Sequence, residues 1–130
     1  MKYLIDTDWV ADWLAGRPAA TTLLARLLLD GYAISIMTYG EVYEGIYFGR
    51  NRPAHEAGFR RFLRGVQVLP INRTTARQFA IIRGTLRAQG QLIPQPDILI
   101  GATSISYNLI LVTRNIRDFQ RIPGLQLYQV

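Results

Sequence analysis

The chain has 130 residues, the size of one domain, and it contains no cysteine, which excludes disulfide bonds and thiolate metal sites. Its formal net charge is +6, and every basic residue except Lys2 is an arginine, which suits phosphate recognition but also fits a codon bias towards arginine. No apolar run approaches the roughly 20 residues needed to span a bilayer, so we expect a soluble protein of the cell interior with no membrane partner.

Apolar stretches that suit strands alternate with longer stretches that suit helices. The expected elements are a strand over residues 2–5, helices over 8–15 and 18–30, a strand over 33–37, helices over 38–48 and 53–64, a strand over 66–69, helices over 74–89 and 96–107, and strands over 109–112 and 126–128. Because the strands are apolar throughout and helices separate them, we predict one α/β domain over residues 1–130. It would be a three-layer sandwich in which helices flank a central, mainly parallel sheet.

Four of the nine acidic residues stand near predicted strand ends, the edge at which open parallel sheets bind ligands. Asp6 ends the first strand, and Glu41 lies in the first turn of the helix that follows ISIM. Asp97 opens the helix DILIGATSI, and Asp118 comes just after the strand LILV. A parallel sheet brings its strand ends together, so we expect the four carboxylates to converge.

Each of these acids also has a local explanation as a helix cap or a first-turn residue. The alternatives are a capping box of Thr38 with Glu41, a cap of Asn115 with Asp118, a favourable dipole position for Asp97, and a cap of the first helix by Asp6 or Asp8.

Convergence would favour a metal site over separate caps. Several carboxylates that meet without a lysine need a cation, and oxygen ligands without cysteine favour Mg²⁺ or Mn²⁺ over zinc. Without metal, repulsion between the carboxylates should raise the pKa of at least one of them.

Three stretches carry a resemblance to a known family across essentially the whole chain. YLIDTDWVADWL, ISIMTYGEVYEGI and PDILIGATSISYNLILVTRNIRDFQRIPGL resemble, in this order, the motifs of PIN-domain ribonucleases of the VapC toxin type, found in bacterial and archaeal toxin–antitoxin pairs. The resemblance implies a Mg²⁺-dependent endoribonuclease, with Mn²⁺ as a possible substitute. Such an enzyme activates water to cut RNA phosphodiester bonds, leaving a 5′-phosphate and a 3′-hydroxyl.

The resemblance also implies roles for individual residues. The metal ligands and catalytic acids would be Asp6, Glu41, Asp97 and Asp118, with Thr113 as the polar residue beside them. Asp8 stands where the family often has a small polar residue, and its role as a ligand, a cap or a support for a ligand stays open. Arg114 and Arg117 lie beside the acidic site, and we expect them to contact RNA.

The family also implies three partners, namely an RNA substrate, a cognate VapB-like antitoxin and a second copy of the chain in a homodimer. It further implies a location in the prokaryotic cytoplasm. An antitoxin segment would pack along the early helices. The aromatic stripes at helical spacing, formed by Trp9 with Trp13 and by Tyr39, Tyr43 and Tyr47, are therefore either core or partner groove. Leu23 and Leu27 are a candidate face for the homodimer.

Two other functions fit parts of the sequence. The pair Asp6 and Asp8 resembles the DxD motif of haloacid-dehalogenase-type phosphatases, but that chemistry needs a lysine downstream of the motif, and Lys2 lies upstream. The second alternative is a regulatory RNA-binding module that keeps the fold without catalysis. The complete set of acids argues against it.

Overall fold

A parallel four-stranded sheet forms the centre of the protein, whose computed structural model describes residues 1–129. The strands are β1 (Tyr3–Ile5), β2 (Tyr32–Ser35), β3 (Gln67–Leu69) and β4 (Ile110–Val112), in the order β3-β2-β1-β4. Each neighbouring pair is parallel, and Leu4 lies opposite Ala33 on one side and Leu111 on the other. β1 and β2 therefore lie in the middle, with their carboxyl ends at one edge.

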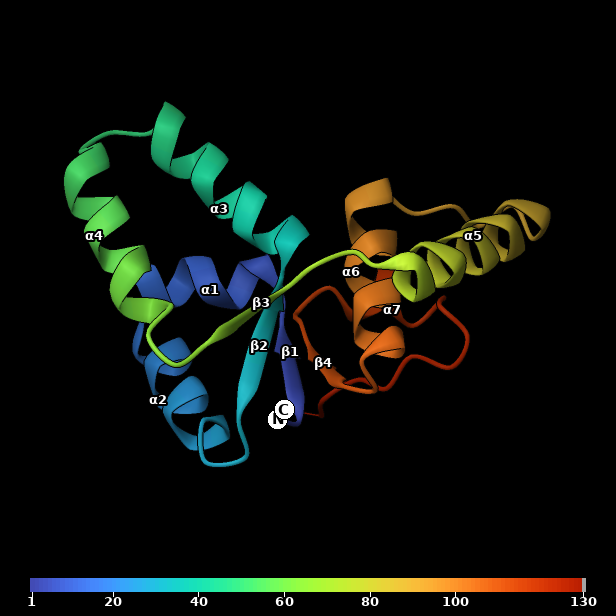
Figure 1. Ribbon diagram of the computed structural model, residues 1–130, viewed down its shortest axis with the longest axis horizontal. Helices are drawn as coiled ribbons and strands as arrows, with labels where there is room; N and C mark the ends of the chain where they lie inside the picture. The colour runs from blue at the N-terminus through green and yellow to red at the C-terminus, as the bar shows by residue number, and fades with distance from the viewer. Residues whose placement is uncertain (130) are drawn as a thin grey trace.

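Seven helices flank this sheet in the described residues. They are α1 (Thr7–Leu14), α2 (Pro18–Leu27), α3 (Ile36–Phe48), α4 (Arg52–Phe62), α5 (Arg73–Ala88), α6 (Gln95–Ser106) and α7 (Ile116–Phe119). In Figure 1, α1 to α4 lie on one side of the sheet, and α5 to α7 lie on the other. This arrangement confirms the predicted α/β sandwich with a parallel central sheet.

Side chains alternate between two hydrophobic clusters along the inner strands. Tyr3 and Ile5 of β1 pack with α1 to α4, whereas Leu4 packs with α5, α6 and α7 on the opposite face. Phe59 and Phe119 are fully buried, one in each cluster. Burying such a side chain contributes roughly 1.5–3 kcal/mol to folding. The apolar segments were correctly predicted as strands of a buried sheet, because helices cover both of its faces.

Most predicted boundaries lie one or two residues from the observed ones, and three differences stand out. The second helix ends at Leu27 rather than residue 30, because the chain turns before Gly31, whose φ of 82° favours glycine. The second strand ends at Ser35, and Ile36 already begins α3. The strand over 126–128 is reduced to one isolated bridge between Leu111 and Leu127.

The proposed dimer face on α2 is also wrong. Leu23 and Leu27 are 5% and 3% exposed, because they point into the cluster beneath α2 rather than towards solvent. Within residues 1–129, no helix is both long and apolar enough to cross a membrane.

Candidate active site

Asp6 is buried at the carboxyl end of β1, directly before the first residue of α1. Its Oδ1 accepts a hydrogen bond from the amide of Thr7 at 2.7 Å, so Asp6, and not Asp8, is the N-cap of α1. Its Oδ2 accepts a hydrogen bond from the hydroxyl of Thr113, directly after β4, at 2.7 Å. The pKa of Asp6 rises to about 7, chiefly because of burial and then because of the charge of Asp8, although both hydrogen bonds lower it.

Glu41 reaches the site from α3 and is not a capping residue. The side chain of Ser35 caps α3 by accepting from the amide of Thr38 at 3.0 Å, which places Thr38 inside the helix. The predicted capping box of Thr38 with Glu41 is therefore wrong. Instead, the hydroxyl of Thr7 donates to Glu41 Oε1 at 2.7 Å, which links α3 to the residue next to Asp6.

Asp97 lies in the first turn of α6 and is partly buried. Its pKa rises to about 6, mainly because of burial and then because of the negative charges of Glu41, Asp118 and Asp8, in that order. Repulsion between the acids therefore acts in the expected direction, although burial is the larger cause. Within the described residues, the ion pairs involve Asp12 and Glu56, and none reaches Asp6, Glu41, Asp97 or Asp118.

Asp118 is connected to Asp6 through a chain of hydrogen bonds. Asn115 caps α7, because its side chain accepts from the amide of Asp118 at 3.4 Å and its Nδ2 donates to Asp118 Oδ2 at 3.2 Å. The amide of Asn115 donates to the hydroxyl oxygen of Thr113 at 3.0 Å, and that hydroxyl donates to Asp6. The predicted cap of Asn115 with Asp118 is confirmed, and it orients an acid of the site at the same time.

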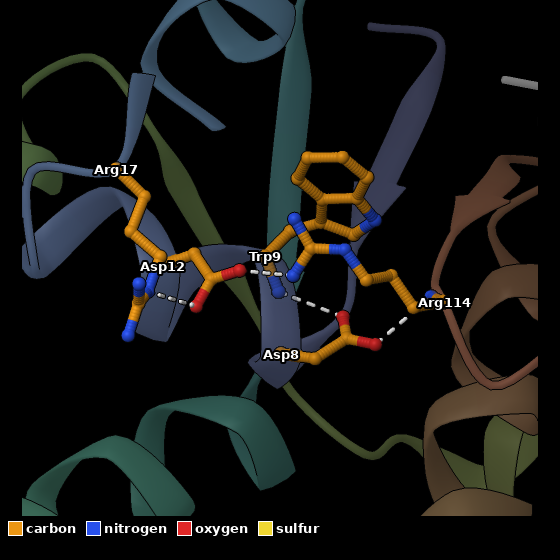
Figure 2. Close-up of polar contacts among 5 residues, drawn as sticks. All are labelled: Asp8, Trp9, Asp12, Arg17 and Arg114. Atoms are coloured by element: carbon orange, nitrogen blue, oxygen red, sulfur yellow. Dashed lines mark hydrogen bonds and ion pairs between the residues drawn. The ribbon is translucent and has the colours of Figure 1, made fainter. Parts of the chain in front are cut away.

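Asp8 supports the loop that follows β4 (Figure 2). Its Oδ2 accepts from the backbone amide of Arg114 at 2.8 Å, and its Oδ1 accepts from the amide of Trp9 at 2.7 Å. Burial is the main cause of the raised pKa of Asp8, against which both hydrogen bonds act. Of the two arginines expected to contact RNA, Arg117 is exposed on α7, and Arg114 has partners within the protein. RNA contact by either stays a prediction.

The end of β1 and the helices α3, α6 and α7 thus each bring one carboxylate towards the same edge of the sheet. Their donors are all oxygen atoms, the pKa values of Asp6 and Asp97 are raised, and none of the ion pairs among residues 1–129 reaches them, so the residues fit a hard divalent cation such as Mg²⁺ or Mn²⁺. Within residues 1–129, no three Asp, Glu or His side chains stand close enough to hold an ion as they are. The metal and its ligand set therefore stay predictions, and binding would need side chains to rotate inwards.

A cavity of about 340 Å³ opens beside the acids, between α1, α3 and α4. Thr7 and Glu41 line one part of it, and His55 and Arg61 line another. The remaining lining is made of small or apolar residues, namely Ala11, Leu14, Ala15, Val42, Gly45, Ile46, Ala54 and Gly58. The site is thus an acidic centre next to an apolar groove.

This arrangement agrees with a family model. The PIN domain model matches residues 3–125, which is almost the whole chain. The chain belongs to the PIN-domain family. Ribonuclease VapC19 of Mycobacterium tuberculosis is a PIN-domain relative that is 33% identical over 95% of this chain and 96% of its own length.

Solved structures show the same PIN fold. A chain of VapBC2 from Rickettsia felis, solved bound to a DNA fragment from the promoter, has a TM-score of 0.92 and 25% identity, over 98% of both chains. A chain of a toxin–antitoxin complex from Klebsiella pneumoniae has a TM-score of 0.74 and 28% identity, over 99% of this chain and 100% of the other. The resemblance to PIN domains of the VapC type is confirmed.

Two polar residues of this PIN domain had no predicted role in the site. The amide of Thr7 donates to Asp6 while its hydroxyl donates to Glu41, and Asn115 links Thr113 to Asp118. The capping pattern revealed Asn115 as a cap, but no sequence pattern indicated its contact with Thr113. Thr7 carried no signal beyond its place between two acids.

Proposed function

We propose that this chain is a divalent-metal-dependent endoribonuclease that acts as the toxin of a toxin–antitoxin pair. The observation that carries the proposal is that Asp6, Glu41, Asp97 and Asp118 come from four separate segments, that Asp97 feels the charges of Glu41 and Asp118, and that none of the ion pairs within residues 1–129 reaches any of the four acids. Family membership supports the same activity, because relatives such as VapC19 are named ribonucleases.

The chain's own residues would hold and orient the reacting groups. Asp6, Glu41, Asp97 and Asp118 would bind Mg²⁺, which would supply an activated water and stabilise negative charge on the phosphodiester. Thr113 holds one oxygen of Asp6, and Thr7 holds one oxygen of Glu41. Each hydrogen bond fixes one carboxylate oxygen in place, and the other oxygen of Glu41 is left for a ligand once the side chains have rotated inwards.

The test is Mg²⁺-dependent cleavage of structured RNA by the purified chain. Wild type should cut in Mg²⁺ or Mn²⁺ and stop in EDTA, and Asp6→Asn and Asp97→Asn should lose at least about a hundredfold in rate, in line with the loss of a metal-bound reaction path. Asp30→Asn is the matched control, because Asp30 is an exposed acid in the turn after α2. Equal cleavage by wild type and the site variants, or no cleavage with either metal, would refute the proposal.

The phosphatase alternative finds no support at this site. Lys2 precedes β1, and so stands at the opposite end of the strand from Asp6, where it lies over the ring of Tyr3. A silent RNA-binding module would bind the same RNA without cutting it, an outcome that the cleavage test distinguishes directly.

The apolar groove next to Glu41 supports the antitoxin part of the proposal. A hydrophobic segment of a VapB-like partner would fill the cavity between α1, α3 and α4, and so cover the acids. Induction of wild type should arrest bacterial growth, and coexpression of a cognate VapB-like protein should relieve the arrest. Asp6→Asn should not arrest growth at all, and arrest by this variant would separate toxicity from the acidic site.

We also propose a homodimer in the prokaryotic cytoplasm, on the strength of family resemblance and bacterial relatives. Since Leu23 and Leu27 are buried, an exposed apolar residue such as Ile81 of α5, 61% exposed, is a better candidate for the interface. Sedimentation of wild type and Ile81→Glu would test this choice, and unchanged dimer formation in the variant would exclude it.

A further inference from the structure

Three contacts that meet at Arg114 connect the loop after β4 to α1 (Figure 2). We propose that Arg114 is a positioning residue that holds Thr113 and the start of α7 in their active arrangement, with Asp8, Trp9 and Asp12 as its anchors. This inference rests on the proposed nuclease function, but it concerns residues outside the predicted set of metal ligands.

The three contacts use three different chemistries. The backbone amide of Arg114 donates to Asp8 Oδ2 at 2.8 Å. Its guanidinium carbon lies 3.8 Å from the centre of the Trp9 ring, the geometry of a cation–π contact. Its Nη1 also forms an ion pair with Asp12 Oδ2. Backbone and side chain of one residue are therefore both attached to the first two turns of α1.

The anchors are themselves fixed. Trp9 is 5% exposed and belongs to the hydrophobic cluster under α1. Its indole Nε1 has no hydrogen-bond partner within residues 1–129, so packing and the stacked guanidinium hold the ring. Asp12 also pairs with Arg17 at 3.3 Å. An exposed ion pair alone would add little. The pair between Arg114 and Asp12, however, supplements the contact of Arg114 with the buried Trp9 ring and its backbone hydrogen bond to Asp8.

The position of Arg114 in the chain gives these contacts a functional consequence. Its predecessor, Thr113, donates to Asp6, and its successor, Asn115, caps α7 and holds Asp118. Release of Arg114 would therefore shift, in one movement, the hydroxyl that orients Asp6 and the cap that orients Asp118. Small displacements of such groups can cost up to about a hundredfold in rate.

The same contacts distinguish positioning from direct RNA binding. Asp12 already pairs with the guanidinium of Arg114, and an RNA phosphate would have to compete with that carboxylate. If Arg114 bound RNA, removing the charge of Asp12 would free the guanidinium and strengthen binding. If Arg114 positions the loop, removing Asp12 should damage turnover in the same way as removing Arg114.

The experiment compares kcat and KM on one short RNA for Arg114→Gln, Asp12→Asn and the double variant. Each single variant should lose about tenfold or more in kcat with KM unchanged within about twofold, and the double variant should be no worse than Arg114→Gln, since residues that act as one unit are not additive. Arg17→Gln is the matched control. It removes the other partner of Asp12, is expected to behave as wild type, and leaves Arg114 in place.

Two substitutions of Trp9 test the contact between its ring and the guanidinium of Arg114. Trp9→Phe keeps an aromatic face, although it loses one ring of the indole and an N–H that has no partner within residues 1–129, so it should retain more of kcat than Trp9→Leu, which should resemble Arg114→Gln. In a Trp13→Phe background, Trp9 is the only tryptophan. Its emission should then change in Arg114→Gln and Asp12→Asn, but not in Arg17→Gln.

Several results would overturn the proposal. A rise in KM for Arg114→Gln with kcat unchanged, together with a lower KM for Asp12→Asn, would make Arg114 an RNA contact instead. Lower thermal midpoints with wild-type kcat would reduce the contacts to fold stability. Unchanged Trp9 emission in both variants would show that the contacts do not persist in solution. If wild type cuts no RNA, the nuclease function fails, and Trp9 emission still decides whether Arg114 is anchored to α1.

Discussion

The hydroxyl of Thr113 donates to Oδ2 of Asp6 across 2.7 Å, although 107 residues separate them in the chain. Parallel pairing of β1 with β4 creates this contact, because Ile5 lies opposite Val112 and each strand is followed by its polar residue at the same edge. A residue that follows β4 thereby helps to orient the most buried acid in the site and lowers its pKa against the larger effect of burial.

Thr113→Val should lower the stability of the fold and shift the pH dependence of cleavage. Valine has nearly the same shape but cannot donate, and loss of a hydrogen bond to a charged group costs about 1.5–3 kcal/mol. Because this bond lowers the pKa of Asp6, its loss should raise that pKa further and shift the acid limb of the pH–rate profile to higher pH. Thr113→Ser keeps the donor and should shift neither. An unshifted profile in Thr113→Val would show that Asp6 does not limit the reaction.

The metal-free protein should lose stability as the pH rises from about 4 to about 7. The pKa of Asp6 is about 7 in the folded chain, above its value of 3.8 without the fold, so its protonation favours folding fully below about 3.8, and this contribution declines until it is lost as the pH rises through about 7. Asp97, whose pKa is about 6, acts in the same direction.

Thermal unfolding in EDTA measures this dependence. Asp6→Asn keeps a residue that can cap α1 and removes the titration, so its unfolding midpoint should vary less with pH than that of wild type. Parallel curves for the two proteins would mean that Asp6 does not titrate in this range.

Mg²⁺ should raise the unfolding midpoint of wild type but not that of Asp97→Asn. A ligand that binds only the folded state stabilises it by RT ln(1 + [L]/Kd), which is about 2.7 kcal/mol at a hundredfold excess over Kd. Asp30→Asn is the control for a general salt effect and should respond as wild type does. An equal rise in wild type and Asp97→Asn would remove Asp97 from the ligand set.

The sequence predicts the class of fold and the place of the site, because both follow from short local patterns. The apolar run Tyr3–Ile5 can only be a buried strand in a covered sheet, and a strand-end acid such as Asp6 follows from it. Local patterns were less reliable at the start of α3, where Ser35 and Thr38 both suit a cap. The amide of Thr38 donates to Ser35, which makes Ser35 the cap, and both side chains are equally buried, so this choice depends on the fold around them.

Contacts between distant segments could not be predicted from such patterns. Asp8 looked like a cap or a ligand, because nothing in residues near it indicates that the amide of Arg114 would lie 2.8 Å away. Leu23 and Leu27 looked like an interface because an apolar helix face is the same in sequence whether it meets a partner or the sheet. In both cases the missing information is which segment packs against the helix.

Arg117→Gln should weaken RNA binding without slowing the chemical step. Arg117 is exposed on α7 one residue before Asp118, in contrast to Arg114, whose guanidinium has partners on α1. Loss of one phosphate contact should raise KM several-fold at moderate salt, leave kcat unchanged, and reduce the slope of log affinity against log salt by about 0.7 for single-stranded RNA. Arg87→Gln is the matched control, since Arg87 is equally charged and exposed but lies at the end of α5. An unchanged salt slope in Arg117→Gln, or the same reduction in Arg87→Gln, would leave α7 without a specific part in holding the substrate.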